Sequence, residues 1–331
     1  MPDFSKVAVI GGGSWATALV KILCENNTTV GWYVRNEVIY DHLLQEGHNP
    51  NYLSGVAFDM SMLDLHTDIN NITQQYDVLI IATPSFYLDN VLAPLTVSLE
   101  NKVIFSAVKG IVPEKKVLVG AYLANTFNVG EALFGVIAGP CHAEEVALER
   151  LSYLTIASNN VALAEQMKEK LACNYIQVSL SDDVIGAEYA ATLKNVYAIA
   201  VGIAHGLGYG DNFISVLISS AMREMKRFIR QVDKKKRNIN NSAYLGDLLV
   251  TAYSVFSRNR MLGNMIGKGY TLKAALMEMT MIAEGYYGAK TTYELSTSFN
   301  GDYPILQFVY QVLYEKGNAK KKMKALSKVL D

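Results

Sequence analysis

The most constraining feature of the sequence is a glycine-rich turn near its beginning. An apolar run, Lys6–Ile10 (KVAVI), leads into three glycines, and an amphipathic segment, Trp15–Cys24, follows. In Gly11-x-Gly13-x-x-Ala16 the first glycine allows a tight turn, the second lets the backbone approach a pyrophosphate, and the third position must be small. We therefore predict a strand, a turn and a helix whose N-terminus binds a dinucleotide. The alternative is a glycine-rich turn in some other α/β protein.

Apolar runs of strand length recur through the first half of the chain. We expect buried strands at Thr29–Val34, Asp77–Ala82, Lys102–Val108 and Phe134–Ala138. Strands that alternate with helical segments indicate a parallel sheet with right-handed crossovers. The first half therefore predicts an α/β domain of the Rossmann type with a mostly parallel sheet.

The pattern changes near residue 185. Later segments are rich in Ala, Leu, Met and Ile at helical spacing: Val184–Arg230, broken at Gly206–Asp211, then Leu272–Leu295 and Pro304–Tyr314. A chain of 331 residues is also too long for one ordinary core. We therefore predict a dinucleotide-binding Rossmann domain at residues 1–184 and an all-helical substrate and catalytic domain at residues 185–331.

Composition argues against several classes of protein. Half of the residues are hydrophobic and the formal net charge is −1, which favours a globular fold and disfavours a nucleic-acid partner. The cysteines are widely spaced and the histidines show no ligand spacing, so we expect neither a disulfide framework nor a bound metal. Val196–Ile203, the most apolar stretch of the second half, is far below the ~20 residues that cross a bilayer. Because we also find no signal peptide, we expect a cytoplasmic protein.

The end of the second expected strand bears on the choice of cofactor. A fold that prefers NAD places Asp or Glu there, to bind both ribose hydroxyls. Here Val34 is followed by Arg35, which cannot accept those bonds but can pair with a 2′-phosphate and stack on adenine. Arg35 thus indicates NADPH, alone or beside NADH, unless it is an ordinary surface arginine.

Two segments of the second half offer side chains for chemistry. In the expected helix around Lys194, the neighbours Ala190, Ala191 and Ala198 are small. An apolar setting disfavours the charged amine and lowers its pKa, as a general base for an alcohol requires, although most helix lysines face solvent. Further on, Asp247 precedes Ser257-Arg258-Asn259, where a guanidinium and a neutral amide could cradle a phosphate.

Together these segments resemble the bacterial NAD(P)-dependent sn-glycerol-3-phosphate dehydrogenase family. The similar stretches include IGGGSWATAL from residue 10, EYAATLKNVYAIAVGI from residue 188 and LGDLLVTAYSVFSRNRMLG from residue 245. The resemblance implies a Rossmann domain and a helical domain with the active site between them. It also implies interconversion of dihydroxyacetone phosphate, a small phosphorylated triose, and sn-glycerol 3-phosphate for phospholipid synthesis. The only macromolecular partner we expect is a second copy of the chain, in a homodimer.

The resemblance further assigns roles to single residues. It makes Lys194 the proton acceptor, with Lys109 polarising the substrate carbonyl and lowering the pKa of Lys194, and Asp247 orienting Lys194 or a substrate hydroxyl. The implied substrate contacts are Lys109, Gly139, Cys141, Lys194, Asp247, Ser257, Arg258 and Asn259. The implied cofactor contacts are Gly11, Gly13, Ser14, Trp15, Arg35, Lys109, Ala143, Arg258 and Glu284.

The chain departs from the family pattern at a few positions. Cys141-His142 stands where the family usually has Ser-Phe. A thiol is a weaker hydrogen-bond partner than a hydroxyl, so we expect the backbone N–H of Cys141 to contribute rather than its side chain. Two other functions remain open: a 3-hydroxy-acid dehydrogenase of similar architecture, which would recognise a carboxylate, and a non-catalytic nicotinamide sensor, which would need neither Lys194 nor Asp247.

Overall fold

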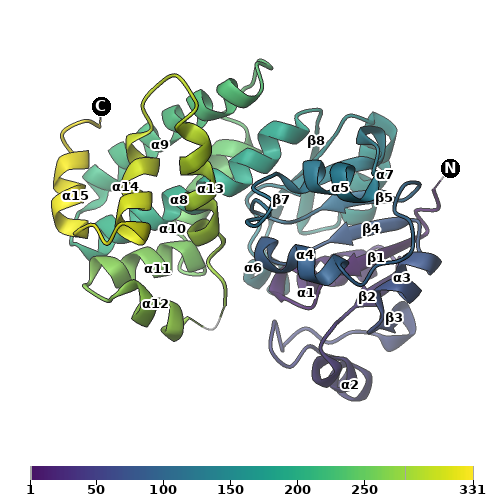
Figure 1. Cartoon of the computed structure of the whole chain (residues 1–331). Coiled ribbons are helices and arrows are strands. Elements are labelled where there is room, and N and C mark those ends of the chain that lie inside the picture. Colours follow the sequence, from purple (N-terminus) through teal and green to yellow (C-terminus); the bar gives the residue numbers. More distant parts are fainter. Residues whose placement is uncertain (1, 280, 331) are drawn as a thin grey trace. The chain divides into compact units, whose positions relative to one another are not determined.

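A computed structural model describes residues 2–279 and 281–330 of the chain (Figure 1). The chain folds into two compact units. The first unit comprises Met1–Val108 and Val117–Val184. The second unit comprises Lys109–Lys116 and Ile185–Asp331. The segment Lys109–Lys116 therefore belongs to the second unit, although in the sequence it lies between two stretches of the first.

The first unit is built on one sheet, with eight strands in its described residues in the order β3-β2-β1-β4-β5-β6-β7-β8. The strands are β1 (Lys6–Ile10), β2 (Thr29–Tyr33), β3 (Leu63–His66), β4 (Val78–Ile81), β5 (Val103–Ser106), β6 (Phe134–Ala138), β7 (Ser152–Ser158) and β8 (Ile176–Ser181). Neighbouring strands are parallel except β6 and β7, which are antiparallel. The order of the first six strands is that of a Rossmann fold, so the predicted fold of this half is confirmed.

Helices connect these strands and flank the sheet (Figure 1). They are α1 (Ser14–Glu25), α2 (Glu37–Glu46), α3 (Ile69–Gln75), α4 (Leu88–Leu92), α5 (Val119–Phe127), α6 (Ala143–Ala147) and α7 (Val161–Leu171). Strands β1, β4 and β5 are buried on both faces, which explains their continuous apolar sequences. The sequence did not predict β3, β7 or β8. Of these, β3 (LDLH) and β8 (IQVSLS) are partly exposed and carry polar residues, so they lack an apolar run.

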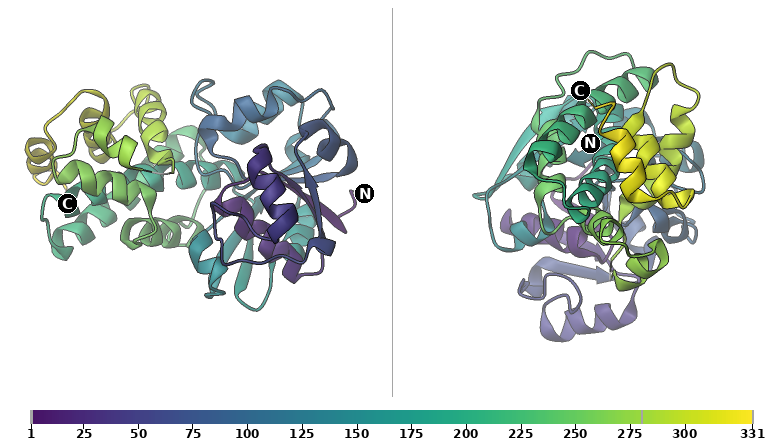
Figure 2. Two further views of the ribbon diagram at one scale, coloured as in Figure 1. Left: turned by 90° about the horizontal axis from the view of Figure 1, so that it is seen from below. Right: turned by 90° about the vertical axis from the view of Figure 1, so that its left-hand side faces the viewer.

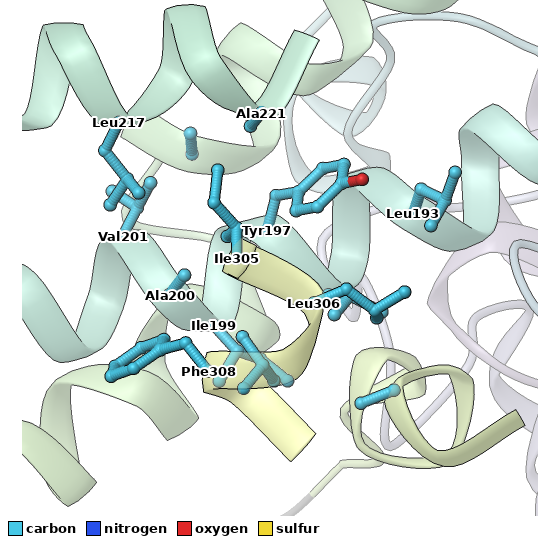
Figure 3. Packing of buried hydrophobic residues seen from close by; sticks show 14 of the residues in the cluster. Leu193, Tyr197, Ile199, Ala200, Val201, Leu217, Ala221, Ile305, Leu306 and Phe308 are labelled. Carbon is cyan, nitrogen blue, oxygen red and sulfur yellow. The ribbon is translucent and has the colours of Figure 1, made fainter. Parts of the chain in front are cut away.

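The second unit is a helical domain, as predicted, and helices are the only regular elements among its described residues (Figures 1 and 2). Its elements are α8 (Val184–Gly206), α9 (Asp211–Val232), the π-helical turn η4 (Ser242–Gly246), α10 (Asp247–Tyr253), α11 (Arg258–Gly267), α12 (Leu272–Glu278), α13 (Glu284–Ser296), α14 (Pro304–Tyr314) and α15 (Ala319–Leu326). Helix α8 is buried along most of its length, because residues of α9 and α14 pack around it (Figure 3). No helix in the described part of the chain is long and apolar enough to cross a membrane.

Helices α8 and α11 cross at two glycines that allow their backbones to touch. A Cβ at Gly202 of α8 would lie 2.1 Å from the carbonyl oxygen of Arg260, and a Cβ at Gly263 of α11 would lie 2.1 Å from that of Ile199. Any side chain at either position would therefore force the helices apart. The close crossing brings α8 within hydrogen-bonding distance of the first turn of α11.

The segment Leu272–Leu295, which has helical spacing in the sequence, forms two helices. Helix α12 ends at Glu278, and α13 begins at Glu284. The physical reason lies at Gly285, where a Cβ would be 2.5 Å from the carbonyl oxygen of Asn195 and the N–H donates to the side chain of Asn259 at 2.8 Å. The N–H groups of a helix's first turn have no partner within the helix, so this anchored N–H marks the start of a new helix.

Candidate active site

Lys194 and Asp247 form a buried ion pair in the second unit. Lys194 lies in the middle of α8, with 3% of its surface exposed, and the neighbouring alanines of α8 are buried as well. Asp247 is the first residue of α10 and is 1% exposed. The ammonium of Lys194 donates a hydrogen bond to Oδ1 of Asp247, and the hydroxyl of Thr251 donates to the backbone carbonyl of Asp247 at 2.6 Å. The fold thus joins two residues that are 53 positions apart.

The surroundings lower the pKa of Lys194 from 10.5 to about 8. Burial is the largest cause, because a charged amine loses its hydration. The carboxylate of Asp247 opposes this shift, and the positive charge of Lys109 adds to it. Lys194 can therefore gain or lose a proton close to neutral pH, as the small residues around it predicted.

The second carboxylate oxygen of Asp247, unlike the first, does not pair with Lys194. Oδ2 is buried and has no hydrogen-bond partner among the described residues. A buried acceptor without a donor is costly, so this oxygen can accept a hydrogen bond that the described residues do not supply. The pair therefore offers one amine that exchanges a proton and one oxygen that accepts a hydrogen bond.

Two buried asparagines connect the segment that carries Lys109 to the helices around Lys194. Asn195 of α8 donates to the carbonyl oxygen of Lys109 at 2.9 Å. Asn259 of α11 donates to the side-chain oxygen of Asn195 at 2.9 Å and accepts from the N–H of Gly285 at 2.8 Å. This amide chain fixes the backbone at Lys109. Asn259 was predicted as a substrate contact, whereas the sequence analysis did not single out Asn195, which directly follows Lys194.

The predicted phosphate cradle lies at the N-terminus of α11. Arg258 is the first residue of the helix and is half-buried. Ser257 is the N-cap residue, and its hydroxyl accepts from the N–H of Arg260 at 3.2 Å. A helix N-terminus carries partial positive charge, and a guanidinium in the same turn adds a full charge with paired donors. The arrangement suits an anion with several oxygens.

The glycine turn of the first unit forms between β1 and α1 as predicted. A Cβ at Gly11 would lie 2.6 Å from the carbonyl oxygen of Ala82, so only glycine fits there. A Cβ at Gly13 would meet no protein atom within 4 Å. Gly13 is also the N-cap residue of α1 and has no side chain to cap the helix, and a helix N-terminus attracts anions.

The remaining predicted contacts fall at strand and helix ends. Arg35 is exposed two residues after the end of β2. Gly139 follows β6 with a φ of +114°, and Cys141 is buried two residues later. Ala143 begins α6 and Glu284 begins α13. Lys109 and Glu284 thus lie in the second unit with Lys194, while the glycine turn, Arg35, Gly139, Cys141 and Ala143 lie in the first.

Comparison with known proteins decides the family. The sequence profile described as the N-terminus of NAD-dependent glycerol-3-phosphate dehydrogenase matches residues 6–164, and that of its C-terminus matches residues 183–324. The chain belongs to the NAD-dependent glycerol-3-phosphate dehydrogenase family. The resemblance predicted from the sequence, with its nicotinamide-dependent class of enzyme, is therefore confirmed.

Single relatives agree along almost the whole chain. The glycerol-3-phosphate dehydrogenase [NAD(P)+] of Bacillus pumilus is 34% identical and covers 94% of this chain and 90% of its own length. That of Pelodictyon phaeoclathratiforme is 33% identical and covers 94% and 93%. The crystal structure of glycerol-3-phosphate dehydrogenase from Coxiella burnetii, 29% identical, superimposes with a TM-score of 0.90 and covers 97% of this chain and 98% of its own.

Proposed function

We propose that this chain interconverts dihydroxyacetone phosphate and sn-glycerol 3-phosphate, with NADH or NADPH as its partner in hydride transfer. The observation that carries the proposal is the buried pair of Lys194 and Asp247, with Lys109 close by. Reduction of a ketone needs a proton donor beside the hydride, and an amine with a pKa of about 8 can provide it. The bound nicotinamide supplies the hydride chemistry.

In this proposal each charged group near Lys194 has a separate task. In the reducing direction the ammonium of Lys194 donates its proton to the oxygen that forms at C2, and in the oxidising direction the neutral amine removes it. The Oδ1 atom of Asp247 holds the amine, and Oδ2 accepts a hydrogen bond from a substrate hydroxyl. The charge of Lys109 polarises the carbonyl. The amide chain through Asn195 supports this arrangement because it holds the backbone of Lys109.

We assign the substrate phosphate to the N-terminus of α11. Arg258 provides the positive charge, and Ser257 and Asn259 provide neutral polar groups in the same turn. A remote phosphate can contribute binding energy that orients the reacting carbon. The glycine turn holds the cofactor pyrophosphate, and Arg35 contacts a 2′-phosphate. The predicted contacts at Gly139, Cys141, Ala143 and Glu284 complete the proposed site.

The direct test is oxidation of NADH and NADPH in the presence of three ketones. We expect fast turnover with dihydroxyacetone phosphate and slow turnover with unphosphorylated dihydroxyacetone or a 3-oxo acid such as acetoacetate. Preference for the oxo acid would favour the hydroxy-acid dehydrogenase alternative. Cofactor binding without turnover of any ketone would favour the sensor.

Family membership also supports a place for this reaction in cells. We propose that the enzyme supplies glycerol 3-phosphate for phospholipid synthesis in the cytoplasm, and that it forms a homodimer. Sedimentation velocity at micromolar concentration tests the assembly, and a monomer over the whole concentration range would contradict it.

A further inference from the structure

Each of the three consecutive glycines in the turn after β1 has its carbonyl oxygen held by a different side chain. The indole N–H of Trp32 donates to Gly11 at 2.7 Å, the amide of Asn49 donates to Gly12 at 3.1 Å, and the hydroxyl of Thr17 donates to Gly13 at 3.0 Å. The three side chains come from β2, from the connection after α2, and from α1. All three are 0% exposed, so water cannot replace these bonds in the folded protein.

Asn49 contributes most to this arrangement because it joins two separate segments. Its Nδ2 atom donates both to the carbonyl of Gly12 and, at 3.0 Å, to the hydroxyl of Thr17. Its Oδ1 atom accepts from the backbone N–H groups of Asn51 and Tyr52, at 3.0 and 3.2 Å. One side chain thus ties the connection after α2 to a glycine 37 positions earlier.

Holding a carbonyl fixes the N–H of the same peptide. In a planar trans peptide the carbonyl oxygen and the N–H of the next residue point in opposite directions. The bond from Asn49 to Gly12 therefore sets the direction of the N–H of Gly13. The backbone N–H of Thr17, at 2.9 Å, and its hydroxyl together hold the carbonyl of Gly13 and so set the direction of the N–H of Ser14. Three successive glycines have more backbone freedom than any other tripeptide, so without the bond from Asn49 the peptide between Gly12 and Gly13 could rotate and present oxygen instead of N–H to an anion.

We propose that Asn49 is a positioning residue for the dinucleotide, which orients the N–H groups of the glycine turn before the cofactor arrives. Preorganised donors avoid the cost of ordering the turn on binding. The connection that carries Asn49 also supports Trp32, since the ring of Phe58 packs edge-on against the indole at 5.4 Å between centroids. The inference rests on the proposed binding of the pyrophosphate at Gly13.

The decisive variant is Asn49→Asp, which keeps an oxygen for the N–H groups of Asn51 and Tyr52 but removes the donor to Gly12. A buried carbonyl left without its donor is costly, so we expect the Kd of NADH, from a fluorescence titration, to rise at least about tenfold. We expect kcat at saturating NADH to change less than about twofold, because the groups around Lys194 are untouched. A rise in Kd with kcat preserved separates positioning from a general loss of folded enzyme.

Asn70, at a more exposed position, provides a control in the same unit. Its side chain also holds a connection, because Oδ1 accepts from the N–H groups of Thr96 and Val97 and Nδ2 donates to the carbonyl of Pro94. It makes no bond to the glycine turn. Asn70→Asp should lower the melting temperature as Asn49→Asp does, while the Kd of NADH stays at the wild-type value.

A second pair of variants covers the case in which Asn49→Asp does not fold. Thr17→Ser keeps the hydroxyl that links Asn49 to Gly13, and Thr17→Val removes it at similar volume. We expect Thr17→Val to raise the Kd of NADH and Thr17→Ser to preserve it. Equal Kd values for these two variants would contradict the inference.

Gly13→Val separates this inference from the proposed site. If Gly13→Val abolishes NADH binding and folded Asn49→Asp binds normally, the positioning role is wrong and the site stands. If both variants bind NADH normally, the glycine turn does not hold the cofactor at all. A fall in kcat of Asn49→Asp at unchanged Kd would also overturn the positioning role.

Discussion

The glycine turn of the first unit and the charged cluster of the second (Lys194, Asp247 and Lys109) are stabilised in different ways. In the turn, the groups proposed to bind a ligand are backbone N–H groups, and buried polar side chains donate to the carbonyl oxygens of the same peptides. In the cluster, the working groups are charged side chains, and backbone contacts and amides hold the segments that carry them. In the first region the flexible glycine backbone must be restrained, whereas in the second the charged side chains around Lys194 must be kept out of water.

This difference decides how each region responds to substitution. Removing a side chain that holds the turn keeps the N–H groups but lets their peptides rotate. We therefore expect a moderate loss of cofactor affinity. Removing a member of the cluster changes the charge in a buried space, where electrostatic interactions are strong, so turnover should change steeply.

Lys194→Met should show the largest effect. The methionine keeps the length of the side chain but cannot exchange a proton, so we expect kcat to fall by about 10² to 10⁴, with the Kd of NADH unchanged. Steady-state kinetics and a fluorescence titration measure the two quantities. Lys116→Met, an exposed lysine of the same unit that pairs with Glu294, is the control and should retain activity. Near-native turnover of Lys194→Met would mean that another group transfers the proton.

Lys109→Met should come second, with a characteristic change in the pH profile. Loss of one group that stabilises developing charge costs about 10² in rate. The wild-type kcat/KM for ketone reduction requires protonated Lys194 and should fall above about pH 8, and the oxidation rate should rise there. Because the charge of Lys109 lowers the pKa of Lys194, its removal should move both inflections to higher pH. An unchanged inflection would show that Lys109 does not act on Lys194.

Arg258→Ala should reduce the preference for a phosphorylated substrate. A charge-assisted hydrogen bond is worth about 1.5–3 kcal/mol, so the ratio of kcat/KM for dihydroxyacetone phosphate over dihydroxyacetone should fall at least about tenfold. Arg260→Ala, in the same helical turn, should leave the ratio at its wild-type value. An unchanged ratio for Arg258→Ala would remove the main support for a phosphate at α11.

Arg35→Ala should give the smallest effect, because Arg35 is exposed and water would screen its pairing with a phosphate. An exposed pair is worth up to ~1 kcal/mol, so the KM of NADPH should rise about fivefold. The KM of NADH measured on the same variant is the internal control and should stay constant. Equal changes for both cofactors would mean that Arg35 does not contact the 2′-phosphate.

Sequence patterns predicted what depends on neighbours along the chain. The strand before Gly11 and the helix after it follow from local hydrophobicity, and the apolar sequence around Lys194 indicated the burial that lowers its pKa. The contacts of Asn195 with Lys109 and of Asn49 with Gly12 join residues 86 and 37 positions apart, and no local pattern carries them. The start of α13 at Glu284 likewise depends on a distant residue, since Asn259 anchors it from another helix.

The eight residues from Lys109 to Lys116 have a consequence for how such enzymes can be recombined. They follow β5 in the sequence but fold with the helical unit, where Asn195 holds the carbonyl of Lys109 and Glu294 pairs with Lys116 at 2.7 Å. A chimera joined near residue 184 would combine this segment from one parent with its docking site from the other. When halves are exchanged between relatives, we therefore expect the proton-transfer centre to work only if Lys109–Lys116 and the helical unit come from the same parent. The segment would then be inserted into the Rossmann domain of the other parent.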